Sequence, residues 1–98
     1  MDNKKLRIKE TFDQALKNQQ KNNLQVAEEL YKEVLKSNPD HVEAHNNLGV
    51  ILLRLGKFQE AKKCFEKVIE INPIYSKAYN GLGNSFNVLG EYLSLIHI

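Results

Sequence analysis

An internal period of 34 residues runs through the sequence and limits the possible folds more than any other feature. The dipeptide Asn38-Pro39 recurs as Asn72-Pro73, and at the same offset the segment AHNNLG at 44–49 recurs as AYNGLG at 78–83. Aromatic and small residues also recur at this offset, which argues against a chance match between low-complexity tracts. The period predicts stacked copies of one structural unit, because each unit can bury its apolar face only against a neighbour.

Each period is predicted to form two helices separated by a turn. Between 42 and 75, apolar residues fall at helical spacing in two groups: Ala44, Leu48, Ile51, Leu52 and Leu55, then Phe58, Ala61, Phe65 and Val68. A glycine that tolerates positive φ separates the groups, and a proline ends the second one. We expect helices near residues 4–20, 24–37, 41–54, 58–71 and 75–89, with close helix crossings at the small residues Ala27, Gly49, Ala61 and Gly83.

These residues resemble the tetratricopeptide repeat (TPR) family. The middle repeat carries its pattern as His45, Leu48, Gly49, Leu52, Ala61, Phe65, Val68 and Pro73, and the third as Tyr79, Leu82, Gly83 and Phe86. The resemblance covers about residues 8–92. It implies an all-α fold of antiparallel helix-turn-helix repeats stacked as a right-handed α-solenoid. We expect an array over 1–92, with two full repeats at about 8–41 and 42–75 and a truncated third at 76–92.

The last six residues, LSLIHI at 93–98, do not continue the repeat pattern. The nucleotides that encode them look like a transposase adapter used in sequencing libraries. We expect a translated adapter that is not native, and a natural protein that continues beyond it. A genuine short hydrophobic tail is the alternative.

Composition and charge argue against several classes of function. Lys plus Arg is 14 and Asp plus Glu is 12, which leaves a net charge of +2 and no basic surplus of the kind typical of nucleic-acid binders. No apolar run is long enough to cross a membrane. A single cysteine permits no intrachain disulfide. We expect a cytoplasmic protein that binds neither nucleic acid nor membrane.

No arrangement of residues predicts an active site, a cofactor site or a metal site. The sequence contains no glycine-rich phosphate loop after a strand and no Ser-His-Asp arrangement. His41 and His45 lie four residues apart on one predicted helix, but two ligands are too few for a metal site. We expect His45 to pack against neighbouring residues and His41 to face solvent. Cys64 is expected to fill space as a small apolar side chain.

The TPR resemblance implies a concave groove, lined by the first helix of each repeat, that holds a peptide. Carried over by repeat position, the groove candidates are Glu43, Asn46, Asn47, Val50 and Arg54 in the middle repeat, and Lys77, Asn80, Asn84 and Asn87 in the third. An asparagine amide offers donors and an acceptor, so it can bind a peptide backbone whatever the peptide's side chains. The other interpretation is that these asparagines only solvate an open helix face.

Three functions remain open on the sequence. The leading one is a scaffold that binds a peptide or partner segment in this groove. The second is a recruiting array of a larger glycosyltransferase-type enzyme, which would make the whole protein an enzyme although these residues are not its catalytic part. The third is self-association through the exposed edge of the last repeat. A carboxylate clamp for acidic chaperone tails is rejected, because only Asn47 and Lys77 match its positions, whereas Phe12, Leu16 and Gly81 do not.

Overall fold

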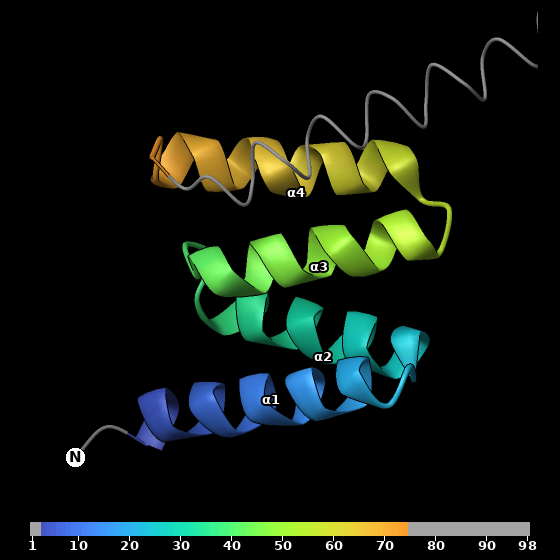
Figure 1. Ribbon diagram of the computed structural model, residues 1–98. Helices are drawn as coiled ribbons and strands as arrows, with labels where there is room; N and C mark the ends of the chain where they lie inside the picture. Colours follow the sequence, from blue (N-terminus) through green and yellow to red (C-terminus); the bar gives the residue numbers. More distant parts are fainter. Residues whose placement is uncertain (1–2, 75–98) are drawn as a thin grey trace, which may run out of the picture.

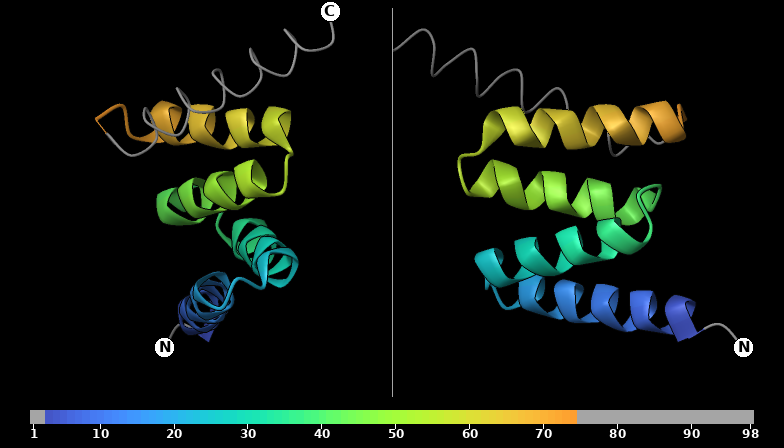
Figure 2. Two further views of the ribbon diagram at one scale, coloured as in Figure 1. Left: turned by 45° about the vertical axis from the view of Figure 1, so that its right-hand side comes forward. Right: turned by 180° about the vertical axis from the view of Figure 1, so that it is seen from behind.

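The computed structural model describes residues 3–74, which form four α-helices and no strand. The helices are α1 (Asn3–Gln20), α2 (Leu24–Ser37), α3 (Val42–Arg54) and α4 (Phe58–Ile71). Consecutive helices run antiparallel, and each packs on the next (Figure 1). Two further views show the same order, with α2 between α1 and α3, and α3 between α2 and α4 (Figure 2). The four helices agree with the sequence prediction to within one residue at each end. The fifth expected helix, at 75–89, the truncated repeat and the adapter tail lie outside the described residues.

The two junctions after the second helices are alike in geometry as well as in sequence. Asn38 ends α2 with φ −139° and ψ 87°, and Asn72 ends α4 with φ −138° and ψ 90°. The side-chain Oδ1 of each asparagine accepts a hydrogen bond from the backbone N–H two residues later, at 3.3 Å in both cases. The sequence period is therefore also a repeat of backbone conformation.

The core follows the predicted apolar positions. Tyr31, Val34, Ile51, Leu52, Phe65 and Val68 are its largest fully buried side chains. Ala15, Ala27, Ala44 and Ala61 are also completely buried, at points where helices meet. The equivalent residues Ala27 and Ala61 both have no exposed surface, in agreement with the expected close helix crossings.

Gly49 explains why a small residue is required in α3. A Cβ atom at this position would lie 2.6 Å from the ring of Phe65, a distance that real Cβ atoms do not tolerate. The ring of α4 therefore lies directly on the backbone of α3. Gly56 serves a different purpose, because its φ of +78° ends α3 in a conformation that other residues rarely adopt.

An ionic cluster joins the two repeats at their second helices. Glu28 of α2 is 6% exposed as a whole residue, and its carboxylate accepts hydrogen bonds from the Nζ atoms of Lys32, at 2.7 Å, and Lys57, at 3.1 Å. Lys57 immediately precedes α4, so this contact ties the first repeat to the second. Burial by itself would raise the pKa of Glu28, but the two lysine hydrogen bonds and charges hold it below its ordinary value.

Candidate functional site

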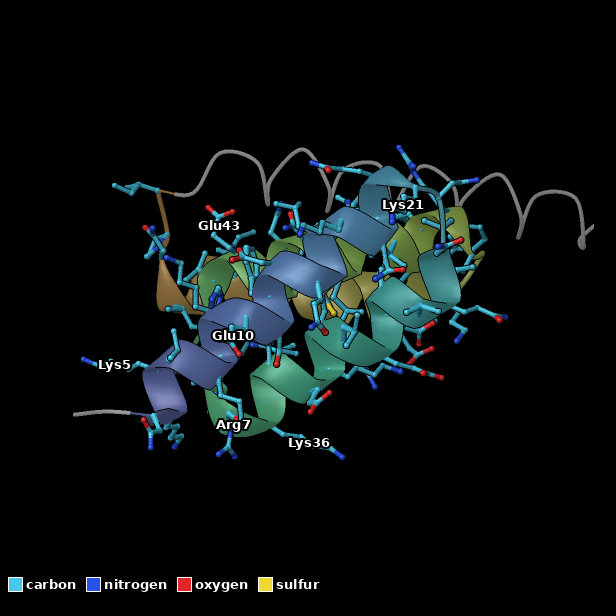
Figure 3. All side chains as sticks on the ribbon, turned by 90° about the horizontal axis from the view of Figure 1, so that it is seen from below. Lys5, Arg7, Glu10, Lys21, Lys36 and Glu43 are labelled. Carbon is cyan, nitrogen blue, oxygen red and sulfur yellow. The ribbon has the colours of Figure 1, made fainter. Side chains whose placement is uncertain are left out.

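The groove candidates of the middle repeat share one side of α3. Glu43, Asn47, Val50 and Arg54 are spaced by four, three and four residues, which places them on one helix face. Glu43 and Arg54 are exposed, while Asn47 and Val50 are half-buried. Seen from below, Glu43 lies along the opposite edge of the molecule from Arg7 and Lys36 (Figure 3). This face combines a carboxylate, an amide, an apolar side chain and a guanidinium.

Asn46 differs from its neighbours on α3 because it is almost completely buried. Its side chain is 5% exposed, and its Oδ1 atom has no hydrogen-bond partner. It therefore offers little surface to a ligand. The four candidates of the third repeat, Lys77, Asn80, Asn84 and Asn87, lie outside the described residues.

Asn47 is held by a hydrogen-bond chain that crosses three helices. Its Nδ2 donates to the hydroxyl of Tyr31 at 3.2 Å, and that hydroxyl donates to Oε1 of Gln19 at 2.6 Å. The three side chains come from α3, α2 and α1 respectively. Burial is the main reason that the pKa of Tyr31 is raised, and the hydrogen bond from Asn47 opposes this effect. No sequence pattern predicted this hydrogen-bond chain.

His41 does not face solvent, and that prediction was wrong. Its Nδ1 accepts the backbone N–H of Ala44 at 3.1 Å, which caps the N-terminus of α3. Its ring also stacks on Phe12 of α1, with 5.0 Å between ring centroids, and Phe12 in turn meets Tyr31 edge to face. Helical spacing describes residues inside a helix, so it gave no information on a residue placed just before one.

His45 and Cys64 agree with their expected packing roles. His45 is half-buried, and its Nε2 lies 2.7 Å from the carbonyl oxygen of Pro39. Burial raises the pKa of the Cys64 thiol to about 11, so it is protonated at neutral pH and is a poor nucleophile. Within residues 3–74 no three or more His, Cys, Asp or Glu side chains gather as a metal site. In the same range no helix is both long enough and apolar enough to cross a bilayer.

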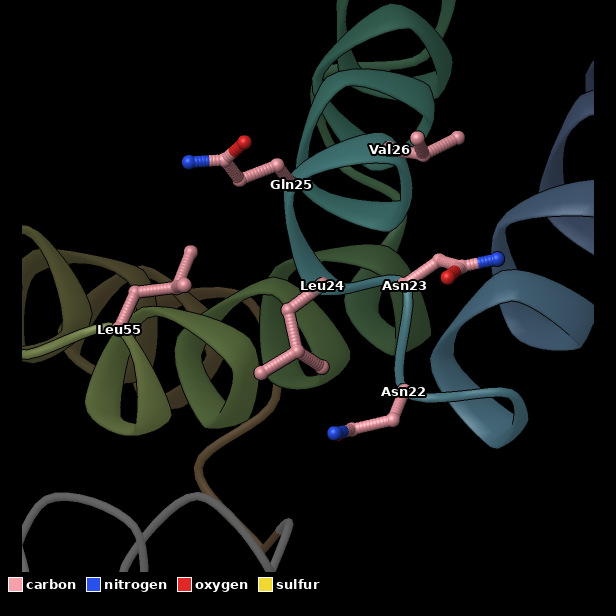
Figure 4. Close-up of a pocket in the computed structure, with 6 residues that line it drawn as sticks. All are labelled: Asn22, Asn23, Leu24, Gln25, Val26 and Leu55. Atoms are coloured by element: carbon pink, nitrogen blue, oxygen red, sulfur yellow. The ribbon is translucent and has the colours of Figure 1, made fainter.

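Three pockets in the described part of the chain lie away from Asn47. One is a shallow hollow beside the turn between α1 and α2, near the end of α3 (Figure 4). Its lining residues are Asn22, Asn23, Leu24, Gln25, Val26 and Leu55. Two others lie along α2, at Lys32 and its neighbours. These hollows are open and shallow, unlike an enclosed small-molecule site.

Comparison with protein families identifies the repeat. A family model for the tetratricopeptide repeat matches residues 42–75, the bounds predicted from the sequence for the middle repeat. By this match, residues 42–75 form a TPR. The TPR fold also accounts for the four antiparallel helices and for the small residues at their crossings. No curated protein matches the sequence.

Several solved structures, two of them TPR domains by name, superpose well on this chain. The second TPR of Spaghetti (RPAP3), bound to the HSP90 peptide SRMEEVD, is 21% identical with a TM-score of 0.82, covering 86% of this chain and 78% of that one. The TPR2B domain of yeast Sti1, in a complex with pHsp70, is 25% identical with a TM-score of 0.83, covering 91% and 71%. MamA is 22% identical with a TM-score of 0.82, covering 85% and 48%. These likenesses show an all-α fold of the TPR kind.

Proposed function

We propose that this TPR array is a protein-interaction scaffold that binds a peptide segment in a concave groove lined by the first helices of its repeats. In the described part of the chain these helices are α1 and α3. The observation that carries the proposal is the face of α3 formed by Glu43, Asn47, Val50 and Arg54, where polar side chains stay at least partly exposed. The TPR domains of Spaghetti and Sti1, which share this fold, were solved with an HSP90 peptide and with pHsp70.

The ligand that fits these residues is a peptide recognised through its main chain. Phe12 and Leu16 stand where a carboxylate clamp needs a lysine and an asparagine, and Phe12 is stacked against His41. An acidic C-terminus would therefore find little compensating charge on α1. Neutral amide groups, in contrast, exchange hydrogen bonds with any peptide backbone.

The test is a selection from a displayed library of random peptides against the full chain, followed by affinity measurements. Asn47→Ala should lower the affinity for the selected peptides by about two- to tenfold, which corresponds to the loss of one net hydrogen bond. Replacing Asn47, Asn80 and Asn84 together should remove most of the binding. The matched control is Gln25→Ala, which removes an exposed amide from α2 and should leave the affinity unchanged.

Salt dependence separates amide recognition from charge recognition. Neutral hydrogen bonds are little affected by ionic strength, whereas a charge-driven site weakens as salt is added. We expect similar affinities at low and high salt. Failure to select any peptide, or equal binding by the triple variant, would overturn the proposal. If binding collapsed at high salt, the charged residues Glu43, Arg54 and Lys77 would instead be the residues that bind the peptide.

A further inference from the structure

The hydroxyl of Tyr31 fixes the orientation of two amide side chains. A phenol has a single hydrogen to donate, and the short contact of 2.6 Å to Oε1 of Gln19 is the distance of an O–H···O bond. The contact of 3.2 Å to Asn47 must then be one that the hydroxyl accepts, so the nitrogen of that amide faces Tyr31. The direction of the hydrogen-bond chain is therefore Asn47 to Tyr31 to Gln19.

This direction determines what each amide has left for a ligand. Asn47 uses one N–H on Tyr31 and keeps its Oδ1 acceptor and its second N–H, whereas Gln19 uses its Oε1 and keeps both N–H donors. The Tyr31 side chain has no exposed surface. Turning Asn47 around would set two acceptor oxygens against a buried hydroxyl with one hydrogen, and turning Gln19 around would leave that hydrogen without an acceptor. Both amides are only half-buried, and they belong to the first helices α1 and α3.

The sequence period shows that the three residues form a unit. One period after Gln19, Tyr31 and Asn47, the sequence has Leu53, Phe65 and Gly81. All three polar side chains are replaced together by residues that have no side-chain hydrogen-bonding group. Phe65 fills the same buried position as Tyr31 without a hydroxyl, so the hydroxyl is not needed to fill the core.

We propose that Tyr31 is a positioning residue that presents an acceptor on α3, Oδ1 of Asn47, and donors on α1, Nε2 of Gln19, to the main chain of an extended peptide. This inference rests on the proposed peptide-binding function and deepens it. The peptide N–H groups face α3 and the carbonyl groups face α1 at this junction. The next junction lacks all three polar side chains, so it offers the peptide main chain no oriented donor and acceptor of this kind.

The first test uses the free chain of residues 1–98 and needs no ligand. In a ¹⁵N-labelled sample, the side-chain NH₂ resonances of Asn47 should be shifted and protected from exchange, and Tyr31→Phe should abolish both effects. The control is Gln19→Glu, whose carboxylate still accepts from Tyr31 and should leave the Asn47 signals protected. Unchanged Asn47 signals in Tyr31→Phe would overturn the assigned orientation, whether or not any peptide binds.

The second test uses peptides selected against the full chain and their ester analogues, in which one backbone N–H at a time is replaced by oxygen. At one position the ester should bind the parent about two- to tenfold more weakly than the amide, because the acceptor of Asn47 loses its donor. Asn47→Ala should not discriminate between amide and ester there, and Tyr31→Phe should discriminate less than the parent.

The outcomes separate the two proposals. If no peptide is selected, the proposed function fails, and the resonances of Asn47 still decide the orientation. If peptides bind through Asn47 but Tyr31→Phe shows the same amide-to-ester ratio as the parent, the positioning role fails and the peptide-binding function stands. Thermal denaturation of Tyr31→Phe checks that the variant is folded, as the equivalent Phe65 leads us to expect.

Discussion

At the scale of single residues, the features of this chain that apolar patterning did not predict are polar groups at helix ends and between helices. His41 caps α3 and stacks on Phe12, and Tyr31 connects two amides. The apolar pattern treats Tyr31 and Phe65 as equivalent, since both rings fill the same site. The signal was nevertheless present in the sequence, because a tyrosine in a buried aromatic position needs a partner for its hydroxyl.

His41 should make the stability of the fold depend on pH. Burial lowers the pKa of His41, and the nearby His45 lowers it further. The hydrogen bond of its own backbone and the charge of Glu43 oppose this shift. Phe12 covers the ring from α1 and carries no charge. A depressed folded-state pKa means that the stabilisation is complete above the unfolded value of about 6.5 and is lost as the pH falls through the folded value. Protonation of Nδ1 also removes the acceptor that caps Ala44.

Urea denaturation between pH 8 and pH 5 measures this effect. We expect the parent to lose free energy of unfolding over this range, and His41→Asn, which caps a helix but does not titrate, to lose less. Identical pH profiles for the two proteins would rule out His41 as the group responsible.

Small side chains at the helix crossings should not tolerate enlargement. Ala61 has no exposed surface, so Ala61→Leu should destabilise the fold by about 1–3 kcal/mol through overpacking. Lys63 is on the same helix but exposed, and Lys63→Leu should have a far smaller effect. Thermal or urea denaturation of both variants makes the comparison, and equal losses would contradict the helix orientation.

At the scale of helices, bounds and faces were predictable because apolar spacing depends on the backbone period alone. The ends of α2 and α4 follow from Asn38-Pro39 and Asn72-Pro73, and the end of α3 follows from Gly56. Contacts between helices of different repeats were not predictable. Glu28 and Lys57 are far apart in the sequence, and only the packing of the helices brings them together.

The contact between Glu28 and Lys57 should couple the two repeats energetically. The Glu28 side chain is 7% exposed and Lys57 is 45% exposed, so the pair is better shielded than an ordinary surface pair. A double-mutant cycle with Glu28→Ala and Lys57→Ala should give a coupling free energy of about 1 kcal/mol. The pair of Lys67 and Glu70, at 3.9 Å on the surface of α4, is the control and should give almost none.

At the scale of the whole molecule, each described helix packs mainly on its neighbours along the chain. The stability of each helix therefore depends on how many residues it buries against those neighbours, and this number differs between helices. Only Ala15 of α1 is fully buried, whereas α3 buries six residues. The fold class was predictable because the repeat period is a property of the sequence. The pairing of Asn47 with Tyr31, which defines the candidate site, required the three-dimensional arrangement of α1, α2 and α3.

Native-state hydrogen exchange should reveal this uneven distribution. Amides of α1 should exchange before those of α2 and α3, because fewer buried contacts hold α1 in place. Exchange of α1, α2 and α3 at one common rate would instead indicate a single cooperative unit.

The matching junctions at Asn38 and Asn72 have a geometric consequence. Their dihedral angles are nearly the same, so the chain leaves both repeats along the same direction relative to the helix just completed. Successive units related by one constant rotation and translation generate a regular screw. We expect that inserting one whole repeat at such a junction would add a step to this screw without changing its pitch, so that the array could become longer at the same curvature.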